Sequence, residues 1–268
     1  MATQNRAASI QGAAIRVTRL DSAGNLMTGP LDSYTMNSFM RVTFTPEYEA
    51  GDEITEKGAD GTVCVTYKAA DTLKRMTLEI AICEPDPEFS ALVSGGILLT
   101  RQSTPGNAST AQSVGWATTR VGEAPSGDGV AIEVWSYAVA DGKRVSSGSG
   151  SYYHWVFPYA TLRQSGDRVI ENGLLANTFS GEGLGNDGFG EGPDGRWEFP
   201  TVTDRPYAYA RTDYAPLSLN GWYQWNSSTG AHTAVTTLTD PGSFTNVPSD
   251  DSYDDTASYD QVLAAEDD

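Results

Sequence analysis

The stretch "LKRMTLEIAICEPDPEFSALVSGG" (residues 73–96) is informative about the fold class, because a strand pattern stands directly before a helix pattern. In residues 73–84 the apolar side chains of Met76, Leu78, Ile80 and Ile82 occupy alternate positions. A period of two residues is typical of a strand with one buried face. The segment therefore predicts a half-buried β-strand.

A short helix is expected immediately after this strand. Asp86 is a suitable N-cap, Pro87 suits the first helical position, and Gly95 suits the C-terminal stop. Three residues between them form an apolar stripe that can hold the helix on a sheet: Phe89, Leu92 and Val93.

Further strands are indicated on both sides of residues 73–96. "FMRVTFTP" (39–46) alternates, with Met40, Val42 and Phe44 on one face. Other strand-like segments are 130–140, 152–164, 168–179 (as one strand or two) and 204–216. The 28 glycines and 13 prolines favour many turns over long helices. We expect a mainly β protein, an antiparallel β-sandwich with one short flanking helix.

An extended hairpin is predicted from "DEITEKGADGTVCVTY" (52–67), with its turn at residues 58–61. Alternation places Val63, Val65 and Tyr67 on one face and Cys64 on the other, with Thr62 and Thr66. A lone two-stranded hairpin is marginally stable in water. We therefore expect this arm to need a packing partner.

Charge excludes some classes of function. The net charge is −18, and ten acids but no Lys or Arg follow Arg211. Holding duplex DNA by phosphate neutralisation needs clustered Lys and Arg, which are missing here.

No apolar run has the length of a membrane span, and the N-terminus does not resemble a signal peptide. Cys64 and Cys83 are expected to be reduced thiols of an intracellular protein.

No catalytic or metal-binding motif is found. His154 lies within an aromatic strand and His232 within a polar segment, and neither is near a nucleophile motif or has zinc-site spacing. We expect no enzyme, no metal and no cofactor. Paired carboxylates keep one alternative open, a secreted acidic β-sandwich that binds or cleaves glycans. Against it, Trp135 and Trp155 lie inside strands, where burial is the usual role.

The stretch "SGEGLGNDGFGEGPDGRW" (180–197) is rich in glycine and acid. It occurs once and lacks the ligand spacing of a calcium loop, so calcium binding is not expected. Glycine here indicates a close approach of backbone to backbone, within the subunit or across an interface.

The order of motifs resembles the major tail proteins of long, flexible-tailed phages of actinobacteria. The resemblance runs from about Gly12 to Arg211. It rests on "IRVTRLDSAGNLMTGP" (15–30), the segment 42–96, "GVAIEVWSYAV" (129–139), "YYHWVFPYATLRQSGD" (152–167) and "ENGLLANTFSGEG" (171–183). It implies a tail-tube β-sandwich assembled as hexameric rings, which stack into a conduit for genome delivery.

This resemblance implies partners, a location and assembly residues. The partners are copies of the chain itself and the tape-measure, tail-tip and terminator proteins, and DNA passes through the lumen without specific binding. The location is the virion, after assembly in the host cytoplasm. Residues 10–211 are expected to be the tube domain. The resemblance does not cover the chain beyond Tyr214, and composition alone indicates that 212–268 are an acidic Ser/Thr/Asp-rich extension, an extended arm or disordered tail from about Trp225 unless a partner orders it. The inter-subunit arm comprises Glu47, Tyr48, Glu49, Asp52, Glu53, Glu56, Lys57, Asp60 and Thr62. The inter-subunit or lumen-facing glycine-rich loop carries Glu182, Asp187, Glu191 and Asp194.

Overall fold

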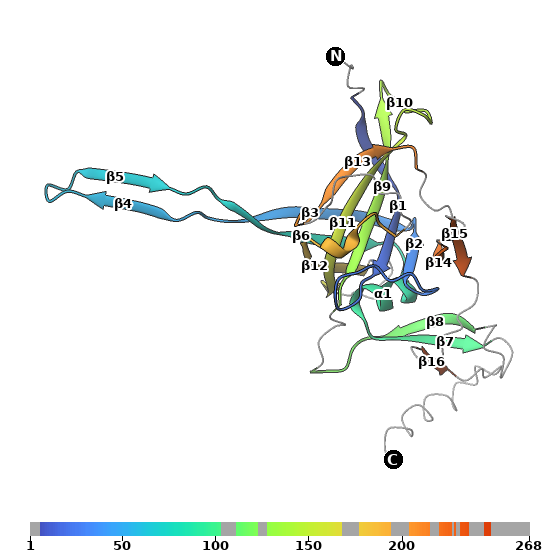
Figure 1. Cartoon of the computed structure of the whole chain (residues 1–268). Helices are drawn as coiled ribbons and strands as arrows, with labels where there is room; N and C mark the ends of the chain where they lie inside the picture. Colours follow the sequence, from blue (N-terminus) through green and yellow to red (C-terminus); the bar gives the residue numbers. More distant parts are fainter. Residues whose placement is uncertain are drawn as a thin grey trace.

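The computed structural model describes residues 6–102, 111–122, 128–167, 177–193, 204–214, 220–226, 228, 231–235 and 244–247. Figure 1 shows a body of curved strands from which one long hairpin projects. The strands are β1 (Ala8–Arg19), β2 (Ser33–Met36), β3 (Phe39–Glu49), β4 (Glu53–Lys57), β5 (Val63–Lys68), β6 (Thr72–Ile82), β7 (Ile97–Gln102), β8 (Ala111–Ala117), β9 (Val130–Ala140), β10 (Lys143–Arg144), β11 (Tyr152–Ser165), β12 (Asn177–Leu184), β13 (Ala208–Thr212), β14 (Gly221–Asn226), β15 (Ala231–Val235) and β16 (Phe244–Val247). The α-helix is α1 (Pro87–Ser94), and a short 3₁₀ helix spans Asp187–Phe189.

One antiparallel sheet of eleven strands forms the body, with the order β15-β14-β2-β1-β9-β11-β12-β6-β3 and with β10 and β13 paired to β9 and β11. Side chains from both halves of this sheet share one core: Ile15 of β1, Ile132 of β9 and Leu78 of β6 are all fully buried in it. Phe44 on the edge strand β3 packs on Phe157 of β11 with ring centroids 5.3 Å apart. The sheet is therefore folded over itself, and the fold is the expected mainly β sandwich.

Helix α1 closes one end of the sandwich and forms as predicted. Asp86 caps it by accepting a hydrogen bond from Phe89 N at 2.9 Å, and Pro87 is its first residue. Phe89 and Leu92 are buried in the core. The helix lies between the main sheet and a small sheet of order β16-β7-β8, in which β16 runs parallel to β7 (Figure 1).

Two predicted strand features need correction. Met40 was expected to share the inner face with Val42 and Phe44, but its side chain is 55% exposed. A register shift between Phe39 and Arg41 reverses the alternation there, so Phe39 packs against the core in place of Met40.

The second correction concerns the segment from about Trp225, which was expected to be an extended arm or tail. Strand β14 pairs with β2 and β15 pairs with β14, so residues 221–235 extend the main sheet. Trp222 and Tyr223 are buried, and Trp222 belongs to the main core. The expected extended arm or tail is therefore wrong for Trp225 and for Ala231–Val235. The predicted domain boundary at residues 211/212 stays a prediction.

Asp213 holds the loop between β9 and β11 through hydrogen bonds, and we expect these hydrogen bonds to make the stability of the folded state depend on pH. Hydrogen bonds from Gly150 N at 3.0 Å and from Ser151 Oγ at 2.8 Å lower the pKa of Asp213 to about 2 from its usual 3.8. Because the folded pKa is depressed, the contribution to stability is full above the usual pKa and is lost as the pH falls through about 2. The NMR amide shifts of Gly150 and Ser151 should titrate with a midpoint near 2. A midpoint near the usual value, or an unchanged titration in Asp213→Asn, would contradict this contact.

Candidate assembly surface

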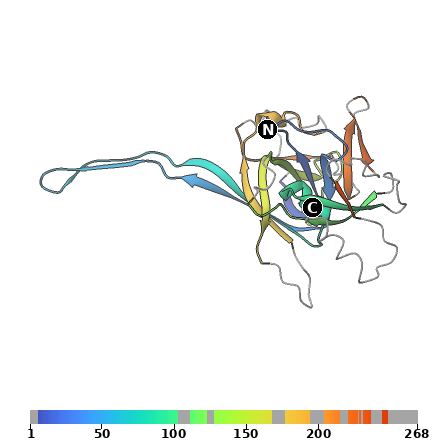
Figure 2. The same cartoon turned by 90° about the horizontal axis from the view of Figure 1, so that it is seen from below.

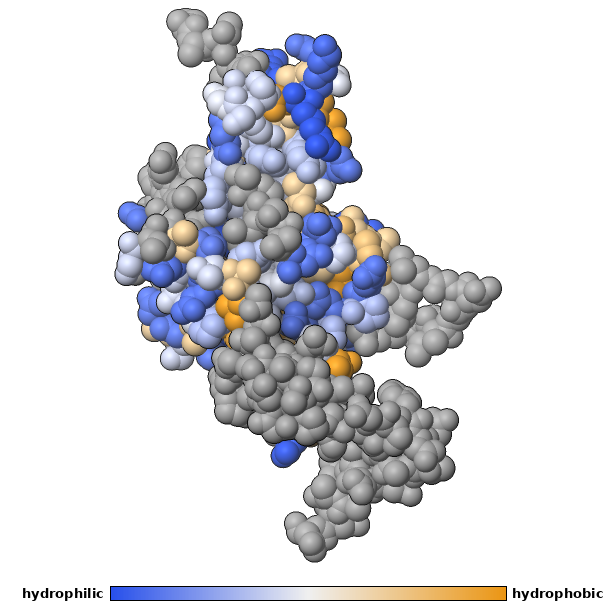
Figure 3. All heavy atoms as spheres, turned by 90° about the vertical axis from the view of Figure 1, so that its right-hand side faces the viewer, coloured by the Kyte–Doolittle hydropathy of each residue, from blue (hydrophilic) through white to orange (hydrophobic). Residues whose placement is uncertain are grey.

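The most prominent surface feature is the arm, made of the outer ends of β3 and β6 followed by the β4–β5 hairpin. Figures 1 and 2 show it leaving the body in a single direction, and no other described element lies along it. The chain between Ala50 and the turn at residue 59 is mostly extended, and at about 3.3 Å per residue it reaches about 30 Å. On the opposite side of the body, the described residues are mostly hydrophilic, with some hydrophobic patches between them (Figure 3).

Gly51 lies at the joint between the base of the arm and its tip. Its N–H donates to Asp71 Oδ1 at 3.1 Å, and Ala69 N donates to Asp52 O at 2.9 Å. A Cβ at position 51 would lie 2.2 Å from Ala69 O, so the two chains come close enough here to require glycine. These backbone contacts at residues 51, 52, 69 and 71 therefore join the β4–β5 hairpin to the outer ends of β3 and β6.

The tip of the arm exposes apolar side chains on one face. Cross-strand partners share a face, and Ile54 pairs with Tyr67 and Glu56 with Val65. Ile54, Val65 and Tyr67 are 54%, 53% and 59% exposed. We call Ile54, Glu56, Val65 and Tyr67 the arm patch.

Val63 was expected on this same face, and this is wrong. The register shifts after the Glu56–Val65 pair, so that Lys57 pairs with Val63. Because β5 has one extra residue here, the side chain of Val63 lies on the same face of the ribbon as Lys57. Val65 lies on the other face. Cys64, at the shift, is exposed and free, and Cys83 is also free.

The structure links the two predicted groups of site residues at the base of the arm. Arg75 forms ion pairs with Glu47 at 2.5 Å and with Glu182 at 2.7 Å. The hydrogen bond from Arg75 lowers the pKa of Glu47. Arg75 was not singled out from the sequence, because its role depends on the register of three strands. These half-exposed pairs contribute little stability but orient the base of the arm.

The other predicted arm residues lie along the arm and its turn. Asp60 accepts hydrogen bonds from Thr62 N at 3.0 Å and Thr62 Oγ1 at 2.6 Å, which close the turn and lower the pKa of Asp60. The remaining side chains are all exposed: Tyr48, Glu49, Asp52, Glu53, Glu56 and Lys57. Their inter-subunit role stays a prediction.

The glycine-rich stretch is more tightly packed than a surface loop. Residues 180–184 belong to β12, and a Cβ on Gly181 would lie 1.7 Å from Thr161 O of β11. A Cβ on Gly188 would lie 2.3 Å from Gly24 O. The predicted close approach of backbone to backbone therefore occurs within the subunit.

Phe189, an aromatic residue within this glycine- and acid-rich stretch, anchors it to the body. Its ring is 1% exposed and packs in a second core cluster with Leu20, Ala131 and Val156. Asp187 and Glu191 are exposed on either side of it, and Asp194 lies outside the described residues. A lumen-facing or inter-subunit role for these acids stays a prediction.

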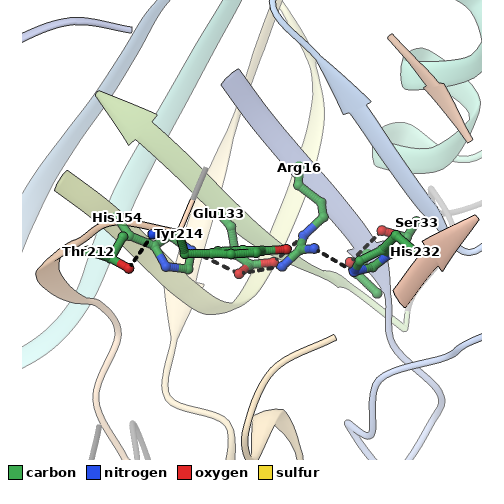
Figure 4. A network of polar contacts seen from close by, with 8 residues as sticks. Arg16, Ser33, Glu133, His154, Thr212, Tyr214 and His232 are labelled. Atoms are coloured by element: carbon green, nitrogen blue, oxygen red, sulfur yellow. Dashed lines mark hydrogen bonds and ion pairs between the residues drawn. The ribbon is translucent and has the colours of Figure 1, made fainter. Parts of the chain in front are cut away.

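A buried polar network crosses the outer face of β1, β9 and β11 (Figure 4). Arg16 and Glu133 are almost completely buried and form a double contact, Nε–Oε2 at 2.6 Å and Nη2–Oε1 at 2.8 Å. His154 Nε2 lies 2.9 Å from Glu133 Oε1. Burial raises the pKa of Glu133, but the charge of Arg16 and the hydrogen bond from His154 outweigh it and lower the pKa overall.

His232 completes this network from β15. Arg16 Nη1 lies 3.0 Å from His232 Nε2. Since a guanidinium only donates, Nε2 is the acceptor and carries no proton. The side chains of Trp135 and His154 stack at 4.3 Å, and Trp135 is fully buried as expected. His154 and His232 thus pack and form hydrogen bonds in a network that attaches the β14–β15 hairpin to the body.

Two kinds of feature are absent from the described residues. No group of three or more His, Cys, Asp or Glu side chains is placed to hold a metal ion. Within the same residues, no helix is long and apolar enough to cross a membrane.

Comparison with known proteins gives distant likenesses among solved structures only. No protein-family model matches the chain, and no curated protein does. A similar solved structure is a chain of the six-fold symmetrised baseplate of the anti-feeding prophage, with 10% sequence identity and a TM-score of 0.27. The match covers 68% of this chain and 93% of that chain. A likeness of this size establishes neither a common fold nor a common function.

Proposed function

We propose that this chain is a structural subunit that assembles with copies of itself, and that the arm makes the contact between copies. The observation that carries this proposal is the exposure of Ile54, Val65 and Tyr67 on a two-stranded ribbon remote from the core. Such a ribbon is marginally stable alone. Covering a large apolar side chain contributes about 1.5–3 kcal/mol. A neighbouring subunit that covers the arm patch therefore stabilises both the arm and the assembly.

The assembly that we propose is the tail tube of a long, flexible-tailed phage. The support is the sequence resemblance to major tail proteins together with the mainly β sandwich and its single α-helix in the described chain. In this proposal hexameric rings stack into a conduit for genome delivery in the virion. The tape-measure, tail-tip and terminator proteins are its other partners. The chain acts without enzymatic activity or a cofactor.

The charge of the chain supports the same proposal. A wall rich in Lys and Arg would bind phosphate and slow the passage of DNA. A net charge of −18 favours a lumen lined by more acid than base, through which DNA moves without specific binding.

Removing the tip of the arm tests this function. Residues 53–68 are replaced by an Asn-Gly turn between Asp52 and Ala69, whose backbones are already hydrogen-bonded. We expect a folded protein, with circular dichroism and thermal unfolding close to wild type, that no longer forms rings or tubes in negative-stain images. A matched control, Thr55→Ala on the other face of the ribbon, should assemble normally. Normal tubes from the arm-replaced variant would contradict the proposal.

A further inference from the structure

A groove lies between α1, the segment after β1 and strand β14. Its volume is about 610 Å³, and its apolar lining includes Met27, Leu31, Leu92, Leu98 and Trp222. We call it the α1 groove. Its size and lining suit a few apolar side chains.

Arg19 also lines the α1 groove and is half-buried. Its side chain forms no ion pair within the part of the chain that the structure describes. Two acids share the lining. Asp32 already accepts a hydrogen bond from Gly29 N at 2.7 Å, and Asp128 is exposed. Among the described residues, Arg19 is thus a cation in a largely apolar groove without a carboxylate partner.

The arm patch has the complementary composition. Glu56 lies on the same face as Ile54, Val65 and Tyr67, directly opposite Val65. Its carboxylate forms no ion pair with any described residue, and Lys57 and Lys68 lie on the opposite face of the ribbon. Within the described part of the chain, Glu56 is therefore an acid without an ion-pair partner among apolar side chains, and Arg19 is a base without one in a largely apolar groove.

We propose that the arm patch of one copy docks in the α1 groove of another copy, with Glu56 paired to Arg19. The inference rests on the proposed self-assembly and names the surface that receives the arm. The arm leaves its own body in one direction (Figures 1 and 2), so its tip does not contact the groove of the same copy. Apolar contacts supply the affinity, and the Glu56–Arg19 pair fixes the register, because a mismatched charge at this point is repelled.

Charge exchange tests this docking directly. Glu56→Arg alone and Arg19→Glu alone each place like charges together, and each should raise the concentration needed for assembly at least about tenfold. The double variant restores an opposite pair and should assemble within about threefold of wild type, since a direct contact is non-additive. Assembly is measured by sedimentation over a dilution series of the full chain. Thr55→Arg, which adds the same charge on the other face of the ribbon, should leave it unchanged.

The outcomes separate this inference from the proposed function. If the arm-replaced chain fails to assemble while Glu56→Arg assembles normally, the arm acts elsewhere and only the docking site is wrong. A double variant as defective as the single variants also overturns the Glu56–Arg19 contact. If the wild-type chain stays monomeric at every concentration, both proposals fail.

Discussion

Glu133→Gln is expected to destabilise the protein by about 3–5 kcal/mol, the cost of breaking a buried ion pair by removing one charge. Glu133 accepts from Arg16 at 2.6 and 2.8 Å and is almost completely buried. Without the carboxylate, the Arg16 guanidinium stays buried but loses the opposite charge of Glu133. The loss should appear in urea unfolding as a lower midpoint with an unchanged slope.

A second variant separates charge from packing. Arg16→Met combined with Glu133→Gln also removes the buried guanidinium charge and keeps similar volumes, so it should be more stable than Glu133→Gln alone. Equal stability of wild type and Glu133→Gln would mean that the network does not hold the folded state together. A double variant less stable than the single would show that apolar replacement fails at this site.

Gly181→Ala is expected to give the second large loss, because the added Cβ would lie 1.7 Å from Thr161 O. This oxygen is backbone of the paired strand β11, and residues 161 and 162 move only if the pairing of β11 and β12 is disturbed. Overpacking of this kind costs about 1–3 kcal/mol or more. Thermal unfolding measures the effect.

Gly183→Ala is the matched control on the same strand. The nearest atom to its added Cβ is Leu78 Cδ1 at 3.0 Å, the end of a side chain that can adjust. The loss should therefore be smaller than for Gly181→Ala. Equal stability of the two variants would contradict the close contact of Gly181 in β12 with the backbone of Thr161 in β11.

Local signals in the sequence predicted much of the fold. The Asp86 cap, Pro87 and the apolar stripe placed α1, and alternation placed β6. The strand-like segments 130–140 and 152–164 are β9 and β11. These signals succeed because they depend only on neighbouring residues. The failures at Met40 and Val63 have one cause, a register shift that reverses the inner and outer faces and that alternation does not reveal.

Several residues of the candidate site could not be predicted from the sequence, because their contacts join strands that are far apart in the chain. Arg75 joins Glu47 to Glu182, and the network joins Arg16 to Glu133 and His232, across strands far apart in the chain. Trp222 and Phe189 are single large apolar residues in polar surroundings. Their burial depends on where the chain returns to the body, which a window of neighbouring residues does not contain.

Copies of this chain are expected to assemble through the arm, and images of the purified full chain can show this assembly. Negative-stain micrographs over a range of concentrations are predicted to show rings or tubes for wild type and isolated particles for the arm-replaced variant. Isolated, uniform particles of the wild-type chain at all concentrations, with affinity for glycans on a carbohydrate array, would contradict the claim and favour the glycan-binding alternative.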